Sequence, residues 1–253
     1  LEMEQAKAIL VGYSNTEFVL EEGRICAAVI KEPIQVDKIR VLIKTDNFSQ
    51  MIHDEVRLTA DCDFSVSYGL KEETYTKGQT VTITPDSYML GKTRVFVKPK
   101  DSKGKITILS VERNQMNPSY RGTMEIARKE EGLILVNELS IEEYLYAVIP
   151  SEMPTSYGTE ALKVQAICAR SYAYKQLMAN SCSAYGAHVD DSYSYQVYNN
   201  IPENEVSMKA VKETHGKVLT YGGEIITAYY FSTSCGHTTN AQEVWNSAEQ
   251  VPY

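Results

Sequence analysis

Short runs of apolar and β-branched residues, separated by turn residues, dominate the first half of the chain and predict β-strands. The predicted strands are Cys26–Ile30, Ile39–Lys44, Glu55–Thr59, Phe64–Tyr68, Thr80–Thr84, Arg94–Val97, Ile106–Val111 and Leu133–Val136. The polar segment Lys98–Lys105 is typical of a turn that joins two antiparallel strands. We therefore predict a strand-rich region over residues 1–138 that serves as a scaffold or a binding surface, either separate from the following region or continuous with it.

The pattern changes at Ser140, where helix signals replace strand signals. Ser140 and Glu143 fit a capping box, in which the serine begins a helix. The predicted helices are Ile141–Val148, Thr159–Met178 and Glu203–His215. The first should stop near Pro150, and Gly216 should end the third. The second is apolar on nearly every face, which is typical of a buried central helix.

The end of the chain predicts a β-hairpin followed by a polar loop. Lys217–Tyr221 and Glu224–Phe231 flank Gly222-Gly223, a strong two-residue turn signal. Small polar residues then fill Ser232–Thr239. The predicted fold class is α+β, with a strand-rich N-terminal half and a mixed α/β half over residues 139–253, in which about three helices surround a central buried helix.

The composition excludes several classes of function. The chain has 253 residues, of which 25 are basic and 33 acidic, and its net charge of −8 comes without a dense basic cluster. Nucleic acids and anionic membrane surfaces are bound through such clusters, so neither is expected as a partner. No Gly-rich phosphate loop is present, which argues against nucleotide chemistry. No apolar run reaches the ~18 residues of a membrane span, and Leu1–Gln5 is acidic where an export signal is positive.

Cysteine and histidine residues in the second half leave alternatives open. Cys182, His188, Cys235 and His237 could supply four zinc ligands, although their spacings are loose. Cys182 and Cys235 could instead form a disulfide, or all four residues could lie in ordinary surface loops. Cys168 falls on an apolar stripe of a predicted helix and is expected in the core, which argues against a cysteine protease.

Glu152 is the first candidate for catalysis. It lies between Pro150 and Pro154, beside the apolar end of a predicted helix. A carboxyl group with apolar neighbours has a raised pKa, which suits a general acid near neutral pH. The alternative is a solvated acid without a catalytic role. In addition, 13 of the 18 tyrosines follow Ser140, and tyrosine-rich surfaces suit ligands with both apolar faces and hydroxyl groups.

Several short motifs, in a fixed order, resemble the SpoIID/LytB domain family, which includes the stage II sporulation protein D and amidase-enhancer proteins. The motifs are Val136–Leu145, Val148–Pro154, Leu162–Ala173, Gln196–Tyr198, Phe231–Thr238 and Glu243–Trp245. Each motif is weak alone, but their common order is specific. The resemblance is clear over Leu133–Tyr253 and looser from Ile39 onward.

The resemblance implies a peptidoglycan lytic transglycosylase, which cleaves glycan strands between MurNAc and GlcNAc and leaves 1,6-anhydroMurNAc ends during engulfment in sporulation. It implies no cofactor and an extracytoplasmic location, secreted or anchored at the outer face of the cell or engulfing membrane. The expected partners are glycan strands stripped of stem peptides, a cell-wall amidase and other engulfment proteins. The same family implies an alternative, a non-enzymatic amidase enhancer or glycan-binding modifier of another cell-wall hydrolase.

The resemblance also implies roles for individual residues. Glu152 matches the catalytic acid, and Arg170 matches the site arginine. The residues expected to bind substrate are Ser151, Gln165, Tyr198, Tyr230, Ser232, Ser234, Gly236, His237 and Thr238. Some family members bind zinc just before the Gln-Val-Tyr motif, but Asp190–Tyr195 contains neither Cys nor His, so no metal is predicted. The chain stops at Tyr253 where family domains continue, so the catalytic region is expected to be incomplete.

Overall fold

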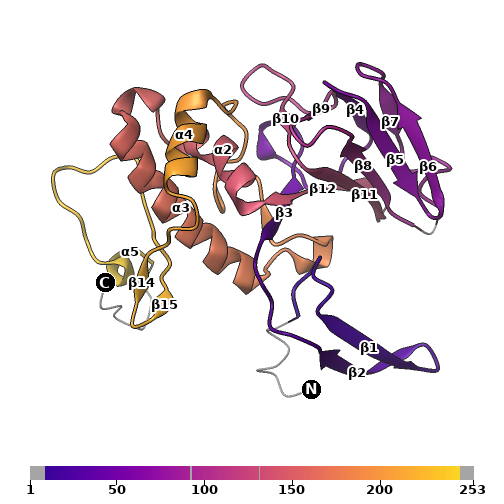
Figure 1. Cartoon of the computed structure of the whole chain (residues 1–253), viewed down its shortest axis with the longest axis horizontal. Coiled ribbons are helices and arrows are strands. Elements are labelled where there is room, and N and C mark those ends of the chain that lie inside the picture. The colour runs from indigo at the N-terminus through magenta and orange to yellow at the C-terminus, as the bar shows by residue number, and fades with distance from the viewer. Residues whose placement is uncertain (1–8, 92, 131, 246–253) are drawn as a thin grey trace.

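The computed structural model describes residues 9–91, 93–130 and 132–245, and places the helices beside a group of β-sheets (Figure 1). The strands are β1 (Thr16–Glu21), β2 (Arg24–Ile30), β3 (Lys38–Ile43), β4 (Val56–Ala60), β5 (Phe64–Tyr68), β6 (Lys71–Tyr75), β7 (Val81–Ile83), β8 (Val95–Pro99), β9 (Ile106–Ile108), β10 (Ser119–Tyr120), β11 (Thr123–Lys129), β12 (Gly132–Ser140), β13 (Val189–Asp190), β14 (Thr220–Tyr221) and β15 (Glu224–Ile225). The α-helices are α2 (Ile141–Glu152), α3 (Thr159–Ala179), α4 (Glu205–Glu213) and α5 (Ala241–Trp245). The predicted α+β class is confirmed.

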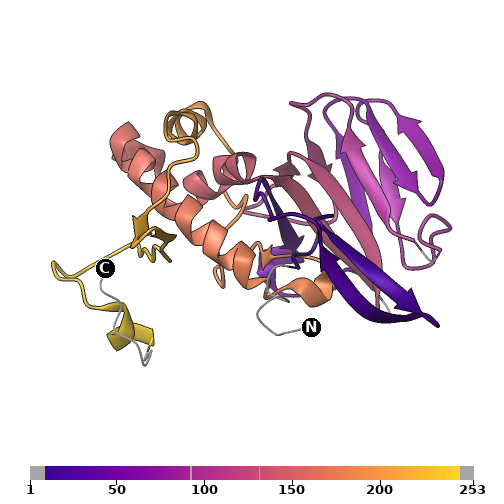
Figure 2. The ribbon, with the colours of Figure 1, turned by 60° about the horizontal axis from the view of Figure 1, so that its bottom comes forward.

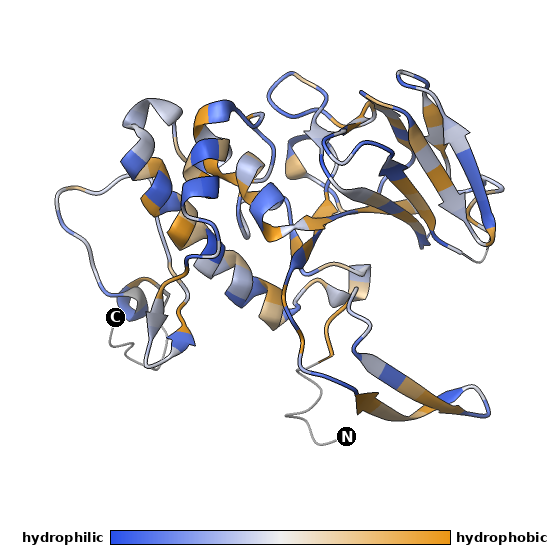
Figure 3. Cartoon of the chain, in the orientation of Figure 1, coloured by the Kyte–Doolittle hydropathy of each residue, from blue (hydrophilic) through white to orange (hydrophobic). Residues whose placement is uncertain are grey.

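Two sheets share one core in the strand-rich region. Within the described ranges, the larger sheet has the order β13-β3-β12-β11-β8-β5-β6 and the smaller one the order β10-β9-β4-β7. Alternate residues of both sheets are buried in the same cluster, such as Val56 and Leu58 of β4 and Val95 and Val97 of β8. Figure 3 shows this alternation along the strands. It is the pattern that predicted the strands, and the predicted strands are confirmed.

The turn predicted at Lys98–Lys105 does not join a hairpin. β8 before it lies in the larger sheet, whereas β9 after it pairs with β4 and β10 in the smaller sheet. A polar segment indicates that the chain changes direction, but the partner of a strand depends on residues distant in sequence. The segment therefore connects the two sheets.

The pattern of apolar residues does not predict β11, because charged residues interrupt it. Glu125 of β11 is only 4% exposed and forms ion pairs with Arg40, at 2.6 Å, and with Arg94. Such partners offset the cost of removing a carboxylate from water. A charged segment can therefore form a central strand, which pairs with β12 and β8.

β1 and β2 form a separate hairpin that projects from the body of the protein (Figures 1 and 2). β2 contains the predicted strand Cys26–Ile30, while β1 is not predicted. Phe18, Leu20 and Ile25 are exposed on this hairpin.

The start of α2 follows the predicted capping box, but its end differs from the prediction. The Ser140 hydroxyl accepts a hydrogen bond from the Glu143 N–H at 3.2 Å. α2 continues past the predicted end at Val148, includes Pro150 and ends at Glu152. A proline inside a helix leaves the carbonyl of the preceding turn without its N–H partner. The Tyr146 carbonyl instead accepts from the Ser207 hydroxyl, at 3.4 Å, so the helix continues.

α3 packs against α2 and α4 but is not enclosed on all sides. Val164 and Met178 remain exposed on α3, so the prediction of a fully buried helix is correct only for the side that faces its neighbours. α4 lies within the predicted range, and Gly216 follows it with a φ of +69°, as expected for a residue that ends a helix. The Gly222-Gly223 turn joins β14 and β15, which are shorter than predicted.

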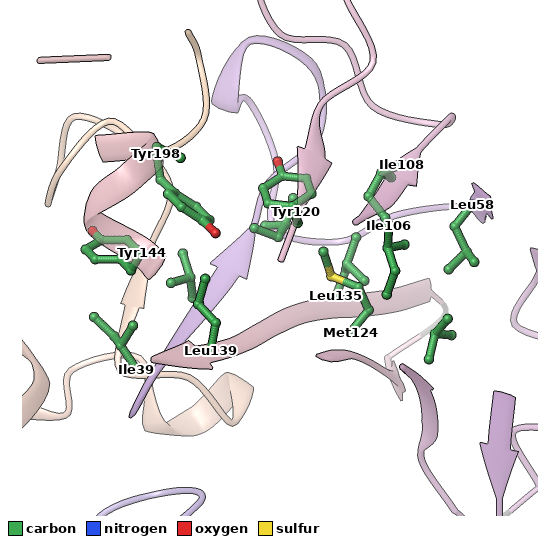
Figure 4. Packing of buried hydrophobic residues seen from close by; sticks show 14 of the residues in the cluster. Ile39, Leu58, Ile106, Ile108, Tyr120, Met124, Leu135, Leu139, Tyr144 and Tyr198 are labelled. Atoms are coloured by element: carbon green, nitrogen blue, oxygen red, sulfur yellow. The ribbon is translucent and has the colours of Figure 1, made fainter. Parts of the chain in front are cut away.

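The buried core continues between the strand-rich region and the helices. Figure 4 shows Tyr144 and Tyr198 near Ile39 and Leu139, and all four belong to the cluster that fills the space between the sheets. The boundary predicted at residue 138 stays a prediction. The expected truncation at Tyr253 lies outside the described residues.

Arg113 and Asp191 also connect the two regions. Their side chains are at most 1% exposed and form an ion pair at 2.7 Å. None of the helices that the structure describes is long and apolar enough to cross a lipid bilayer.

Candidate active site

Glu152 lies at the C-terminal end of α2, and its carboxyl group is partly buried. Its Oε1 accepts a hydrogen bond from the Val197 N–H at 2.7 Å. Burial raises the pKa of this carboxyl group above its ordinary value of 4.5, and the Val197 N–H offsets only part of the rise. The partial negative charge at the end of a helix acts in the same direction as burial. Glu152 is therefore suited to hold a proton at a higher pH than an exposed glutamate.

Three tyrosines surround Glu152. The pKa values of Tyr144, Tyr172 and Tyr230 are raised, mainly by burial and in part by the charge of Glu152, which places all three near the acid. The Tyr172 and Tyr230 rings meet edge to face, with 6.3 Å between their centroids. Aromatic rings and hydroxyl groups thus lie near the carboxyl group, as the tyrosine-rich second half of the chain led us to expect.

Gln196 links two of these tyrosines. Its Oε1 accepts from the Tyr144 hydroxyl at 3.3 Å, and its Nε2 donates to the Tyr230 hydroxyl at 3.0 Å and to the Ala169 carbonyl at 3.2 Å. The neighbouring residue Val197 holds Glu152, so one short segment orients both the acid and its aromatic surroundings. Gln196 was part of a matched motif, but it was not among the predicted site residues.

The Ser151 hydroxyl group forms hydrogen bonds within the protein. It donates to the Ala147 carbonyl at 2.7 Å and accepts from the N–H groups of Asn200 and Ile201, at 3.1 and 3.0 Å. These bonds tie the end of α2 to the chain that follows Gln196. Ser151 was expected to bind substrate, but its hydrogen-bonding capacity is used within the protein.

Ser151→Ala is expected to lower the free energy of unfolding by about 1–2 kcal/mol, because two backbone N–H groups lose their acceptor. Urea unfolding followed by circular dichroism measures this change. Ser156→Ala, in the exposed turn after α2, is the control and should change stability by less than about 0.5 kcal/mol. Equal stability of the two variants would show that the Ser151 bonds are not important for the fold.

Arg170 is not beside Glu152. Its guanidinium group is 4% exposed and binds both carboxylate oxygens of Glu142, each at 2.8 Å, at the opposite end of α2. It also donates to the Lys217 carbonyl at 2.9 Å. Among the described residues, no hydrogen bond or ion pair joins Arg170 to Glu152. Arg170 connects α3 with α2 and with the chain after α4.

Two other residues expected to line the cleft are buried. Tyr198 is 1% exposed, donates to Asn137 Oδ1 at 2.8 Å and packs against the rings of Tyr120 and Tyr144 (Figure 4). Gln165 is 6% exposed, and its Nε2 has no hydrogen-bond partner within the part of the chain that the structure describes. Tyr198 is thus a core residue in this structure.

The chain after β15 contains six of the residues expected to bind substrate. Of the residues expected here, Tyr230 lies at the site. The remaining ones are exposed, namely Ser232, Ser234, Gly236, His237 and Thr238. Figure 2 shows this part of the chain on the outside of the helices. Their roles in binding substrate stay predictions.

Of the four residues considered as zinc ligands, His188 and Cys182 have other partners. His188 is buried, with Nδ1 accepting from the Arg40 N–H at 3.1 Å and Nε2 at 2.8 Å from the Val11 carbonyl, and burial lowers its pKa to about 4. Cys182 lies 3.4 Å from the Tyr195 hydroxyl and is a free thiol, like Cys235. No three potential ligands gather at one place among the described residues. The proposed disulfide is not formed, and the prediction that the protein binds no metal stays a prediction.

The fold and this site define an α+β protein in which one partly buried acid lies near aromatic residues. Residues 129–221 match the family model SpoIID, described as stage II sporulation protein. This region of the chain is similar to the SpoIID family, and the resemblance inferred from its motifs is confirmed.

Curated relatives share the same region. Stage II sporulation protein D of Bacillus subtilis (strain 168) is 39% identical over 132 residues, which are 47% of this chain and 38% of the relative. An uncharacterized protein of Brachyspira hyodysenteriae is 36% identical over 135 residues, 53% of this chain and 36% of the relative. The amidase enhancer of Bacillus subtilis is 44% identical over 109 residues, 43% of this chain and 14% of the relative. The match spans well under half the length of these relatives, and no solved structure matches the chain.

Proposed function

We propose that this protein is a peptidoglycan lytic transglycosylase, and that Glu152 is its general acid and base. The observation that carries the proposal is the partly buried carboxyl group of Glu152, whose pKa is raised by burial and which lies among Tyr144, Tyr172 and Tyr230. Such a group can donate a proton near neutral pH. Tyr172 and Tyr230, which are only partly buried, offer aromatic surface for a sugar ring.

A single acid suits this reaction. An ordinary glycosidase uses two carboxyl groups, one of which acts as a nucleophile or activates water. Within the described residues, burial and the Val197 N–H account for the pKa of Glu152, and no second carboxylate is among the causes. In a lytic reaction the 6-hydroxyl of muramic acid attacks its own anomeric carbon, so no water has to be activated.

Glu152 donates one proton and takes one back in each round of the reaction. The protonated carboxyl group gives its proton to the glycosidic oxygen as the bond to the anomeric carbon breaks. The resulting carboxylate then takes the proton of the 6-hydroxyl as the new bond forms, which restores the acid. The products are a strand with a 1,6-anhydromuramic end and a strand with a free hydroxyl group.

Incubation of the protein with glycan strands stripped of stem peptides tests the proposal. Mass spectrometry should detect new 1,6-anhydromuramic ends. Products with a reducing muramic end would show ordinary hydrolysis, and a complete lack of cleavage would contradict the assignment. The relative named stage II sporulation protein D supports a role in cell-wall remodelling during sporulation, outside the cytoplasm.

The name of another relative, amidase enhancer, supports a second candidate function. In this alternative the protein binds glycan or a cell-wall amidase and stimulates that hydrolase without cleaving glycan itself. The two functions differ in one measurement. Stimulation of amidase activity without any anhydro ends would favour the alternative.

The rate of glycan cleavage is expected to fall as pH rises through the pKa of Glu152, because only the protonated form can donate. Since burial raises this pKa, the midpoint of the fall should lie above 4.5. Initial rates of anhydro-product release at constant ionic strength, between about pH 4 and pH 8, measure it. A midpoint at or below the value of an exposed glutamate would contradict the role of burial.

A further inference from the structure

Three tyrosines of the strand-rich region meet at one carboxylate, far along the chain from Glu152. The Tyr68, Tyr75 and Tyr88 hydroxyl groups all donate to Glu73, with distances of 2.8 Å from Tyr75 and 3.4 Å from Tyr88. Only five of the 18 tyrosines precede Ser140. Three of these five tyrosines therefore share Glu73. Glu73 lies in β6, at the edge of the larger sheet, and Tyr88 lies in the chain that follows β7.

The Tyr88 ring is both exposed and held in place. It is 70% exposed, and it meets the Tyr68 ring edge to face at 5.7 Å between centroids. The next two residues, Met89 and Leu90, are buried and anchor the loop. The turn before Tyr88 is closed by a hydrogen bond from the Thr84 N–H to the Ser87 hydroxyl at 2.8 Å. An aromatic side chain fixed in this way loses little conformational freedom when it binds a ligand.

The chemistry of this cluster limits the ligand. Hydrogen bonds from Tyr68 and Tyr75 lower the pKa of Glu73, so it is a carboxylate at neutral pH. A carboxylate on a protein of net charge −8 disfavours densely charged anionic ligands, such as nucleic acid or an acidic membrane. A sugar ring matches the cluster better, because its apolar C–H face can lie on an aromatic ring while its hydroxyl groups reach neighbouring oxygens.

We infer that Tyr88, with Tyr68, Tyr75 and Glu73, forms a second binding surface for the glycan strand, separate from the candidate active site. The choice of a glycan rests on the proposed function. A long glycan strand can contact the candidate active site and this second surface at the same time. The second contact lengthens the time that the protein stays bound to the strand. The strand-rich region then acts as a binding module.

The test uses the full chain with Glu152→Gln, which keeps the glycan intact, and insoluble glycan strands stripped of stem peptides. Binding is measured by depletion of the protein from solution. Adding Tyr88→Ala is expected to weaken binding about tenfold, the effect of losing one aromatic contact. Tyr88→Phe keeps the ring face and should bind within about twofold of the parent. Tyr193→Ala removes a ring of similar exposure on another loop and should leave binding unchanged.

Two outcomes would overturn the inference. One is equal binding by the Tyr88→Ala and Tyr193→Ala variants, and the other is no binding by the parent. A thermal unfolding midpoint unchanged by Tyr88→Ala shows that the loss of affinity is local. The proposed activity is judged separately by the anhydro ends that the wild-type protein produces. Binding that depends on Tyr88, together with a lack of anhydro ends, would disprove the proposed activity but support this binding surface.

Discussion

Glu152→Gln is expected to lower the rate of glycan cleavage about 10²- to 10⁴-fold, the usual contribution of a general acid. Glutamine has nearly the same shape, and its side-chain oxygen can still accept the hydrogen bond from the Val197 N–H. The variant therefore keeps the structure of the site and loses only the proton. The measurement is the initial rate of 1,6-anhydromuramic end formation.

The same variant is expected to be more stable than the wild type at neutral pH. The carboxyl group has its ordinary pKa in the unfolded chain, whereas burial raises the pKa in the folded protein. The folded protein thus binds more protons between these two pKa values, and the wild type loses stability as pH rises through that interval. Glutamine does not ionise. Its advantage should be absent below about pH 4 and complete above the folded pKa.

Glu160→Gln is the matched control. Glu160 is an exposed acid at the start of α3 whose partner is Lys163. This variant should cleave glycan at the wild-type rate and show no stability gain at neutral pH. Undiminished cleavage by the Glu152 variant would exclude that residue as the acid. Loss of activity with no stability gain at neutral pH would leave Glu152 in the reaction but contradict the raised pKa.

Arg170→Ala is expected to destabilise the protein by about 3–5 kcal/mol, because it leaves Glu142 without its partner in a nearly buried site. The side chains of Arg170 and Glu142 are 4% and 18% exposed, so water can replace the guanidinium only in part. The free energy of unfolding in urea measures the loss. Arg170→Lys should recover only part of it, since an ammonium group cannot bind both carboxylate oxygens at once.

Two comparisons separate a structural role for Arg170 from a catalytic one. Adding Glu142→Ala to Arg170→Ala should cost less than the sum of the single changes, since the unpaired carboxylate is then removed. Arg57→Ala breaks an exposed ion pair with Glu55 and should cost less than about 1 kcal/mol. An Arg170→Ala protein of full stability without activity would support the cleft role that the family resemblance implied.

Local patterns predicted much of the secondary structure. The strands announced by β-branched runs are present, and so are the Ser140 cap and the Gly222-Gly223 turn. The predicted end of α2 and the missing prediction of β11 were wrong, because in each case a residue distant in sequence supplies a hydrogen bond or a charge that the local segment lacks. Ser207 satisfies the carbonyl freed by Pro150, and Arg40 compensates the buried Glu125.

The candidate site was predictable to a smaller extent. Glu152 was found from its prolines and apolar neighbours, and Tyr230 from the family resemblance. Gln196 and Tyr172 lie within matched motifs, but the motifs do not reveal their roles, which depend on the approach of three segments around the end of α2. The enrichment of tyrosine in the second half of the chain was the one sign in the sequence that the surroundings of Glu152 would be aromatic.

The amino-acid sequence by itself determined the resemblance to the SpoIID family, the α+β class and Glu152 as the candidate acid, because these depend on local periodicity and on motifs in a fixed order. Only the tertiary structure decided that Arg170 binds Glu142, that Tyr198 lies in the core and that Val197 holds Glu152. The physical reason is that charge pairing, burial and a raised pKa are properties of groups brought together from distant parts of the chain.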